Sequence, residues 1–160
     1  MSIEQAYFAR ESYIAKLRTQ IGELEFSTPE GFGLTPAPTL RAVYNGIGPD
    51  RWSRRFRKIT TAILAWFEPS ALIHDWEYTY GKKTYWRFTV ANARFAFNAA
   101  WEALQVYADA EHRWRKTLKR AAQGLALALL CQAGGYKGYK SAVPPDEWRP
   151  PENEETELIS

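Results

Sequence analysis

One short segment of the chain combines a histidine with groups that could set its chemistry. Residues 71–81 read ALIHDWEYTYG and contain His74, one of only two histidines in the sequence. On a helix, His74 and Tyr78 lie one turn apart on the same face, whereas Asp75 is rotated by roughly 100°. The imidazole and the carboxylate should therefore point to different neighbours. This arrangement suits a site in which the histidine transfers a proton and the aspartate holds a cation.

A glycine-containing loop earlier in the chain supplies a partner for Asp75. The loop reads YNGIG, begins at Tyr44 and contains Gly46 and Gly48. Glycines let a loop curl so that its carbonyls converge, and Ca²⁺ takes about six to eight oxygen ligands, many of them carbonyls. One carboxylate with several loop carbonyls would make a calcium site of modest affinity. Alone, such a loop is usually a turn and a single helical histidine is usually a core residue, but together they are more specific.

The two motifs together resemble the signature of the phospholipase A2 superfamily. That signature is Tyr-x-Gly-x-Gly followed by a helix with His-Asp-x-x-Tyr, matched here by the loop at Tyr44 and the helix at His74. TVAN, residues 89–92, is similar to the TVAD-like start of the next helix in disulfide-free phospholipase domains of viral capsid and phage proteins. The resemblance covers about residues 42–97. It implies a core of two antiparallel helices flanked by a calcium-binding loop.

The resemblance also implies a reaction, the calcium-dependent hydrolysis of the sn-2 ester of glycerophospholipids. His74 would be the general base on the attacking water, with Tyr78 and Asn92 as its partners in the catalytic site. A divalent cation would stabilise the developing oxyanion, and a histidine with a pKa of about 6.5 suits a base at neutral pH. The implied calcium ligands are one carboxylate and three loop carbonyls, from Asp75, Tyr44, Gly46 and Gly48.

Asn92 stands where the family places an aspartate that orients the histidine. An amide can accept a hydrogen bond from the imidazole, but we expect it neither to fix the tautomer nor to offset the imidazolium charge. In serine proteases the corresponding Asp-to-Asn change costs about 10⁴ in turnover. Two functions therefore remain open, a slow or rearranged hydrolase and a catalytically impaired module with a structural or interaction role in a virus or phage particle or assembly.

The charge distribution favours an anionic partner. Residues 144–160 carry six acids and one base, which leaves 20 bases, 12 acids and a net charge of +8 on residues 1–143. Such a body suits phospholipid headgroups or nucleic acid. Residues 51–58, with five bases and two aromatic rings, form either a surface that docks on anionic lipid or a solvated helix end. A second basic stretch, residues 113–120, accompanies no recognised nucleic-acid-binding motif, so we expect a lipid surface rather than nucleic acid.

Helical periodicity without alternating strands predicts an all-α fold in which further N- and C-terminal helices flank the two core helices. We expect helices over residues 3–24, 51–67, 68–80 and 89–133, the last of them broken near Asp109 or Gly124. Thr89 is the expected N-cap of the last helix. Gly81 is expected in the left-handed position after the preceding helix.

Composition sets the remaining expectations. Residues 1–143 should form a single helical domain and residues 144–160 an acidic, disordered tail. The start has no signal-peptide pattern and no apolar run reaches the roughly 20 residues of a membrane span, so we expect a soluble protein, cytoplasmic or virion-associated. The single Cys131 should be a small buried hydrophobe, and Trp76, Trp86 and Trp101 should pack between helices.

Overall fold

The computed structural model describes the backbone of residues 3–44 and 65–151, with the side chains of residues 12–44 and 66–151. Within these ranges the chain forms helices and turns and no strand, which confirms the all-α class. The elements follow one another as α1 (Ile3–Glu23), the 3₁₀ turn η1 (Phe32–Leu34), α2 (Ala37–Val43), the 3₁₀ turn η2 (Ala65–Phe67), α4 (Glu68–Tyr80), α5 (Tyr85–Val106), α6 (Arg113–Gly134) and α7 (Tyr136–Ser141). Most of the helix predicted over residues 51–67 lies outside the described residues.

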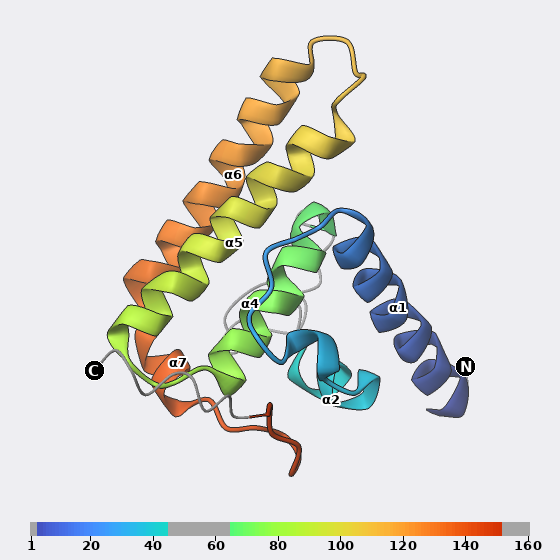
Figure 1. Ribbon diagram of the computed structural model, residues 1–160, viewed down its shortest axis with the longest axis vertical. Coiled ribbons are helices and arrows are strands. Elements are labelled where there is room, and N and C mark those ends of the chain that lie inside the picture. Colours follow the sequence, from blue (N-terminus) through green and yellow to red (C-terminus); the bar gives the residue numbers. More distant parts are fainter. Residues whose placement is uncertain (1–2, 45–64, 152–160) are drawn as a thin grey trace.

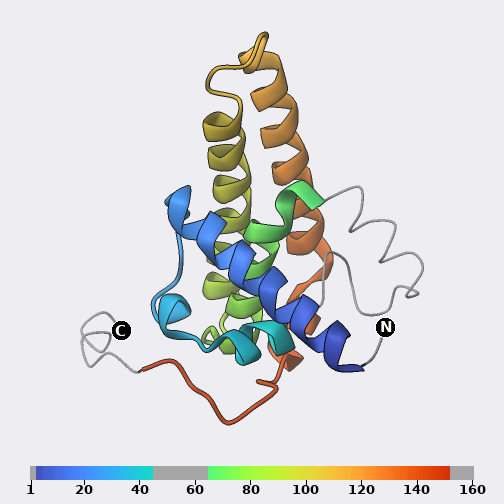
Figure 2. The same ribbon diagram turned by 90° about the vertical axis from the view of Figure 1, so that its right-hand side faces the viewer.

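A long antiparallel hairpin of α5 and α6 dominates the shape (Figure 1). Helix α4 runs antiparallel to α5 and packs against it, and α1 and α2 lie on the far side of α4 (Figures 1 and 2). The tip of the hairpin, at residues 107–112, projects beyond the other helices (Figure 2). Helix α4 is therefore the central element, with α5 on one side and the two N-terminal helices on the other.

Two apolar clusters hold these helices together, and α4 contributes to both. The first joins α1, α2 and α4 through Ile14, Leu17, Ile21, Leu40, Val43, Leu72, Ile73 and Trp76. The second joins η2, α4, α5 and α6 through Phe67, Ala71, Phe95, Ala99 and Ala128. The burial of Ile14, Leu17 and Ile21, at spacings of three and four residues, confirms the amphipathic first helix.

The helix ends differ from the predictions at two positions. Gly81 ends α4 in an extended conformation, with φ −63° and ψ 148°, so the predicted left-handed position is wrong. A Cβ at Gly81 would lie 3.1 Å from the Tyr139 hydroxyl and 2.5 Å from the Glu77 carbonyl oxygen, so close approach accounts for this glycine. The N-cap of α5 is Thr84, whose hydroxyl accepts from the Arg87 N–H at 3.3 Å, so the predicted cap at Thr89 is also wrong.

The break between the last two long helices falls at residues 107–112, near Asp109 as one of the two predictions had it. Gly124 instead lies inside α6, where the hairpin helices meet most closely. Trp76 is buried as predicted and Trp101 is partly buried, but Trp86 is 71% exposed, so the prediction that it packs between helices is wrong. It lies on the face of α5 opposite the buried Phe95, away from the core.

The close contact at Gly124 gives a stability prediction. A Cβ there would lie 2.4 Å from the Cβ of Ala99, an atom that cannot rotate away. Overpacking costs roughly 1–3 kcal/mol, whereas alanine gains about 1 kcal/mol over glycine inside a helix. We therefore expect Gly124→Ala to lower the free energy of unfolding in urea titrations, by up to about 2 kcal/mol. Gly134→Ala, at a position with nothing within 4 Å of a Cβ, is the control and should not destabilise; equal effects of the two changes would contradict the prediction.

The first part of the expected tail lies against the domain. Asp146 accepts hydrogen bonds from the hydroxyls of Thr39 and Tyr80, and the Trp148 ring meets the Tyr80 ring edge-on at 5.2 Å. Residues 152–160 lie outside the described residues. Among the helices that the structure describes, none is long and apolar enough to cross a membrane.

Candidate functional site

The predicted catalytic residues His74, Tyr78 and Asn92 lie together where α4 packs on α5. His74 and Tyr78 occupy successive turns of α4, with ring centroids 4.0 Å apart, and Asn92 faces them from α5. His74 is 7% exposed and Asn92 is 3% exposed, and Phe95 meets the imidazole edge-on at 5.5 Å. The rings of Tyr78 and Phe95 and the amide of Asn92 therefore hold the imidazole in place.

The Asn92 amide binds both α4 residues through its oxygen. The imidazole Nε2 of His74 lies 2.9 Å from Asn92 Oδ1, and the Tyr78 hydroxyl donates to the same oxygen at 3.1 Å. Burial raises the pKa of Tyr78, so its hydroxyl keeps its proton and acts as a donor at neutral pH. Because a carbonyl oxygen only accepts, His74 must carry a proton on Nε2, and in the neutral ring Nδ1 is then the nitrogen with the free electron pair.

Asp75 lies nearer to the histidine than the helix geometry suggested. Its Oδ1 is 3.7 Å from Nδ1 of His74, and its side chain is 26% exposed. The Asp75 carboxylate therefore lies beside Nδ1 of His74. The prediction that the two groups point to different neighbours holds only in part. Residue spacing alone could not give this, because the side-chain torsions decide how far the two groups diverge.

Tyr44 and Cys131 complete the surroundings of Asp75. Burial and the negative charge of Asp75 raise the pKa of Tyr44, whose hydroxyl is buried without a hydrogen-bond partner among the described residues. The same two causes, burial first, raise the pKa of the Cys131 thiol to about 11, so it is a partly buried, protonated thiol and no thiolate nucleophile. The end of α2 and the start of the glycine loop thus lie beside Asp75.

Gly46 and Gly48, the other predicted calcium ligands, lie outside the described residues. Within residues 3–44 and 65–151, no group of three or more His, Cys, Asp or Glu side chains could hold a metal ion. Asp75 with the chain at Tyr44 is therefore the part of the predicted calcium site that the structure describes.

The sequence did not reveal Gln132, which belongs to the same network. Its Oε1 accepts from Asn92 Nδ2 at 2.7 Å, across the α5–α6 contact. The two residues are 40 positions apart, so no local spacing connects them. One signal was available: Gln132 is an isolated polar residue after the apolar run LALALLC, residues 125–131, on a helix expected to pack against its neighbour.

Two buried acids near the site have partners of their own. Glu77 forms an ion pair with Arg94 of α5. Glu102, the next acid along α5 after Asn92, accepts from Gln20 of α1 at 2.9 Å, and burial raises its pKa to about 8. Neither carboxylate forms a hydrogen bond with His74 in the described part of the chain.

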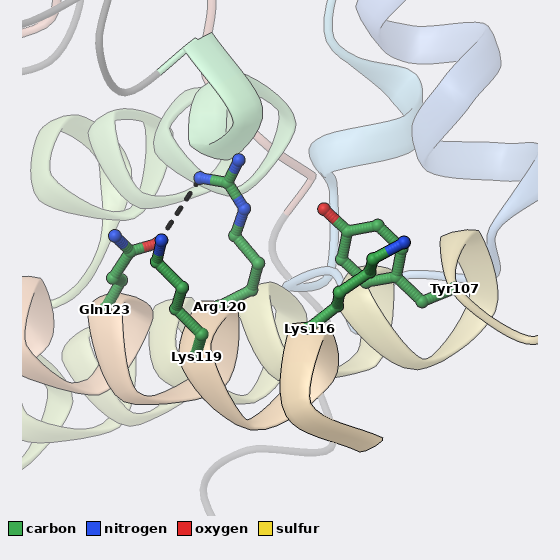
Figure 3. A pocket seen from close by; sticks show the side chains of 5 residues that line it. All are labelled: Tyr107, Lys116, Lys119, Arg120 and Gln123. Carbon is green, nitrogen blue, oxygen red and sulfur yellow. Dashed lines mark hydrogen bonds between the residues drawn. The ribbon is translucent and has the colours of Figure 1, made fainter. Parts of the chain in front are cut away.

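A basic hollow of about 330 Å³ lies along α6, apart from the histidine (Figure 3). It is lined by Tyr107, Lys116, Lys119, Arg120 and Gln123, and none of these is acidic. The Arg120 guanidinium lies 4.9 Å above the ring of Trp66, which stacks on Tyr107 at 5.3 Å. The cations therefore gather on one face of α6 around an aromatic floor, which suits an anionic group.

Comparisons of this chain with protein-family models, with curated proteins and with solved structures found no match.

Proposed function

We propose that this chain hydrolyses the sn-2 ester of glycerophospholipids in a calcium-dependent reaction, with His74 as the general base. The observation that carries the proposal is the hydrogen bond from His74 Nε2 to Asn92, which in the neutral ring leaves Nδ1 unprotonated beside the Asp75 carboxylate. The sn-2 position and the metal come from the resemblance of the sequence motifs.

The steps follow from the protonation of the imidazole. Nδ1 accepts a proton from a water molecule as the water oxygen attacks the ester carbonyl carbon. The imidazolium then returns this proton to the oxygen of the glycerol, and the bond between that oxygen and the carbonyl carbon breaks. The products are a fatty acid and a lysophospholipid. His74 ends each cycle neutral and protonated on Nε2, ready for another turnover.

The described residues fit a calcium ion in part. Asp75 offers a carboxylate that is 26% exposed, and the buried Tyr44 hydroxyl, whose pKa the charge of Asp75 helps to raise, has no hydrogen-bond partner in the described part of the chain, so the place is polar. Calcium prefers such oxygen ligands. When bound, it would supply positive charge to the phosphate and to the oxygen that becomes negative in the transition state.

The charges of α6 support a lipid surface as the partner. The basic hollow of Figure 3 suits a phosphate, and Trp86 and Trp114 are exposed on the same hairpin, as is typical of side chains at headgroup depth. The basic segment of residues 51–58, for which lipid docking and a solvated helix end were both left open, lies outside the described residues.

The alternative is a catalytically impaired module of the same kind with a structural or interaction role, for example in a virus or phage particle or assembly. Two observations favour it. Asn92 brings no charge to offset an imidazolium, and α6 exposes large apolar side chains, Leu118, Leu125, Leu129 and Leu130, that a partner could cover.

Removal of calcium tests the proposal. We expect fatty-acid release from phospholipid–detergent micelles by the wild-type chain to stop when a chelator is added and to return with Ca²⁺. Asp75→Asn removes the one charged group among the four predicted ligands and should raise the calcium concentration for half-maximal rate about tenfold or more, since one charged contact is worth roughly 1.5–3 kcal/mol. Asp109→Asn, in the loop at the hairpin tip, is the matched control. Hydrolysis that persists in chelator would contradict the calcium requirement, and absence of hydrolysis in all conditions would favour the alternative.

A further inference from the structure

The Asn92 side chain can accept a hydrogen bond from His74 in only one of the two orientations of its amide. With Oδ1 toward α4, it accepts from His74 Nε2 at 2.9 Å and from the Tyr78 hydroxyl at 3.1 Å. If the amide turned over, its NH₂ group would face the imidazole, and Nε2 would have to become the acceptor. The proton of the neutral ring would then lie on Nδ1, the nitrogen that should remain free.

Asp75 makes this second arrangement competitive. Its carboxylate lies 3.7 Å from Nδ1, so a proton on Nδ1 would face a negative charge. An asparagine, unlike an aspartate, has one accepting end and one donating end. The choice between the two tautomers of His74 therefore depends on the group that binds the NH₂ end of the Asn92 amide.

Gln132 holds that end, and its own orientation is determined in turn. Its Nε2 donates to the Thr89 hydroxyl at 3.2 Å and to the Tyr85 hydroxyl at 3.1 Å. The Thr89 hydroxyl donates its own proton to the Tyr85 carbonyl at 3.1 Å, so it faces Gln132 as an acceptor. Gln132 must therefore turn its NH₂ toward Thr89 and its oxygen toward Asn92, which it accepts from at 2.7 Å.

We propose that Gln132 is a positioning residue that orients the Asn92 amide and thereby keeps neutral His74 protonated on Nε2, with Nδ1 free as the base. The chain of hydrogen bonds runs from the Tyr85 carbonyl through Thr89, Gln132 and Asn92 to His74. Its catalytic meaning rests on the proposed function, but the tautomer does not. This corrects the expectation that an amide at position 92 leaves the tautomer unfixed, because Gln132 supplies the directionality that an amide alone lacks.

The test is the ¹⁵N spectrum of histidine-labelled protein at a pH at which the imidazoles are neutral. Wild-type His74 should show one protonated-type nitrogen, Nε2, and one unprotonated-type nitrogen, Nδ1. In Gln132→Met the two resonances should move toward each other as the Nδ1–H form becomes populated. In Gln132→Glu, which keeps an acceptor for Asn92, the spectrum should stay as in the wild type. Gln20→Met, at a half-buried glutamine of α1 whose partner is Glu102, is the matched control and should leave the His74 spectrum unchanged.

A double variant separates orientation from packing. The two oxygens of an aspartate are equivalent, so Asn92→Asp has no amide to orient and should restore the Nε2–H spectrum in the Gln132→Met background. If Gln132→Met does not fold, Thr89→Val removes the acceptor that orients Gln132 and should shift the His74 resonances in the same direction. An unchanged His74 spectrum in a folded Gln132→Met or Thr89→Val variant overturns the inference.

Activity gives a second readout. Where the wild type hydrolyses phospholipid, Gln132→Met should lower kcat about tenfold with KM unchanged, since roughly one oriented hydrogen bond is lost. If the wild type never hydrolyses lipid but Gln132→Met still loses the tautomer preference, the role of Gln132 is supported. That result would contradict only the proposed function. Full activity of Gln132→Met, in contrast, overturns the positioning role alone.

Discussion

His74→Ala is expected to reduce calcium-dependent fatty-acid release about 10²–10⁴-fold, the contribution that a positioned general base makes. The reason is that Nδ1 of His74 is the group placed to take the proton of the attacking water, and Nε2 is already engaged by Asn92 at 2.9 Å. The measurement is the initial rate on mixed micelles at saturating calcium. Activity that survives this substitution would show that the mechanism is wrong.

The chain carries its own control for this experiment. His112 is the other histidine, and it lies exposed just before α6 in the left-handed conformation, with φ 56°. His112→Ala should leave the rate unchanged. Because His74 is buried against Tyr78 and Phe95, its removal also leaves a cavity, so His74→Gln should be compared and both variants checked by thermal unfolding. A folded His74→Gln without activity separates chemistry from stability.

The sequence predicted the helices whose apolar spacing is regular and whose ends are marked. Helix α1 follows from Ile14, Leu17 and Ile21, and α4 begins at Glu68 as expected; Pro69 lies in its first turn, where proline is favourable. The start of α5 was misplaced because Thr84 and Thr89 are both suitable N-caps, and only the turn at residues 81–84 decides between them. Gly81 could not be assigned correctly, because the close approach of Tyr139 from another helix is a tertiary fact.

The same division holds for the site. His74 and Tyr78 could be placed on one face because helical spacing determines it, and Asn92 followed from a motif on the next helix. Gln132 could not, because its contact with Asn92 arises from the packing of α6 on α5 and has no counterpart in local sequence. Nor could the 3.7 Å approach of Asp75 to His74, which depends on side-chain torsions. The contacts that could not be predicted from the sequence are therefore those that determine which imidazole nitrogen of His74 carries the proton.

Asn92→Asp is the second substitution with a large expected effect, and it should increase activity. A carboxylate at position 92 would accept the His74 Nε2–H and would also offset the imidazolium that forms during turnover. A charge-assisted hydrogen bond is roughly twice as strong as a neutral one, a gain of about 1–1.5 kcal/mol and hence about a tenfold rise in kcat. Steady-state kinetics on micelles would measure the change.

The expected gain is much smaller than the factor of about 10⁴ that the serine proteases lose on the reverse change. Much of that loss comes from a wrong tautomer, whereas here Gln132 already orients the amide so that Nε2 carries the proton. Only the charge remains to be restored, and burial of a carboxylate at a position 3% exposed should lower the melting temperature at the same time. A gain near 10⁴ would mean that the wild-type tautomer is wrong and that Gln132 does not hold it. No gain, in an enzyme that is active, would mean that Asp75 already offsets the imidazolium from the Nδ1 side.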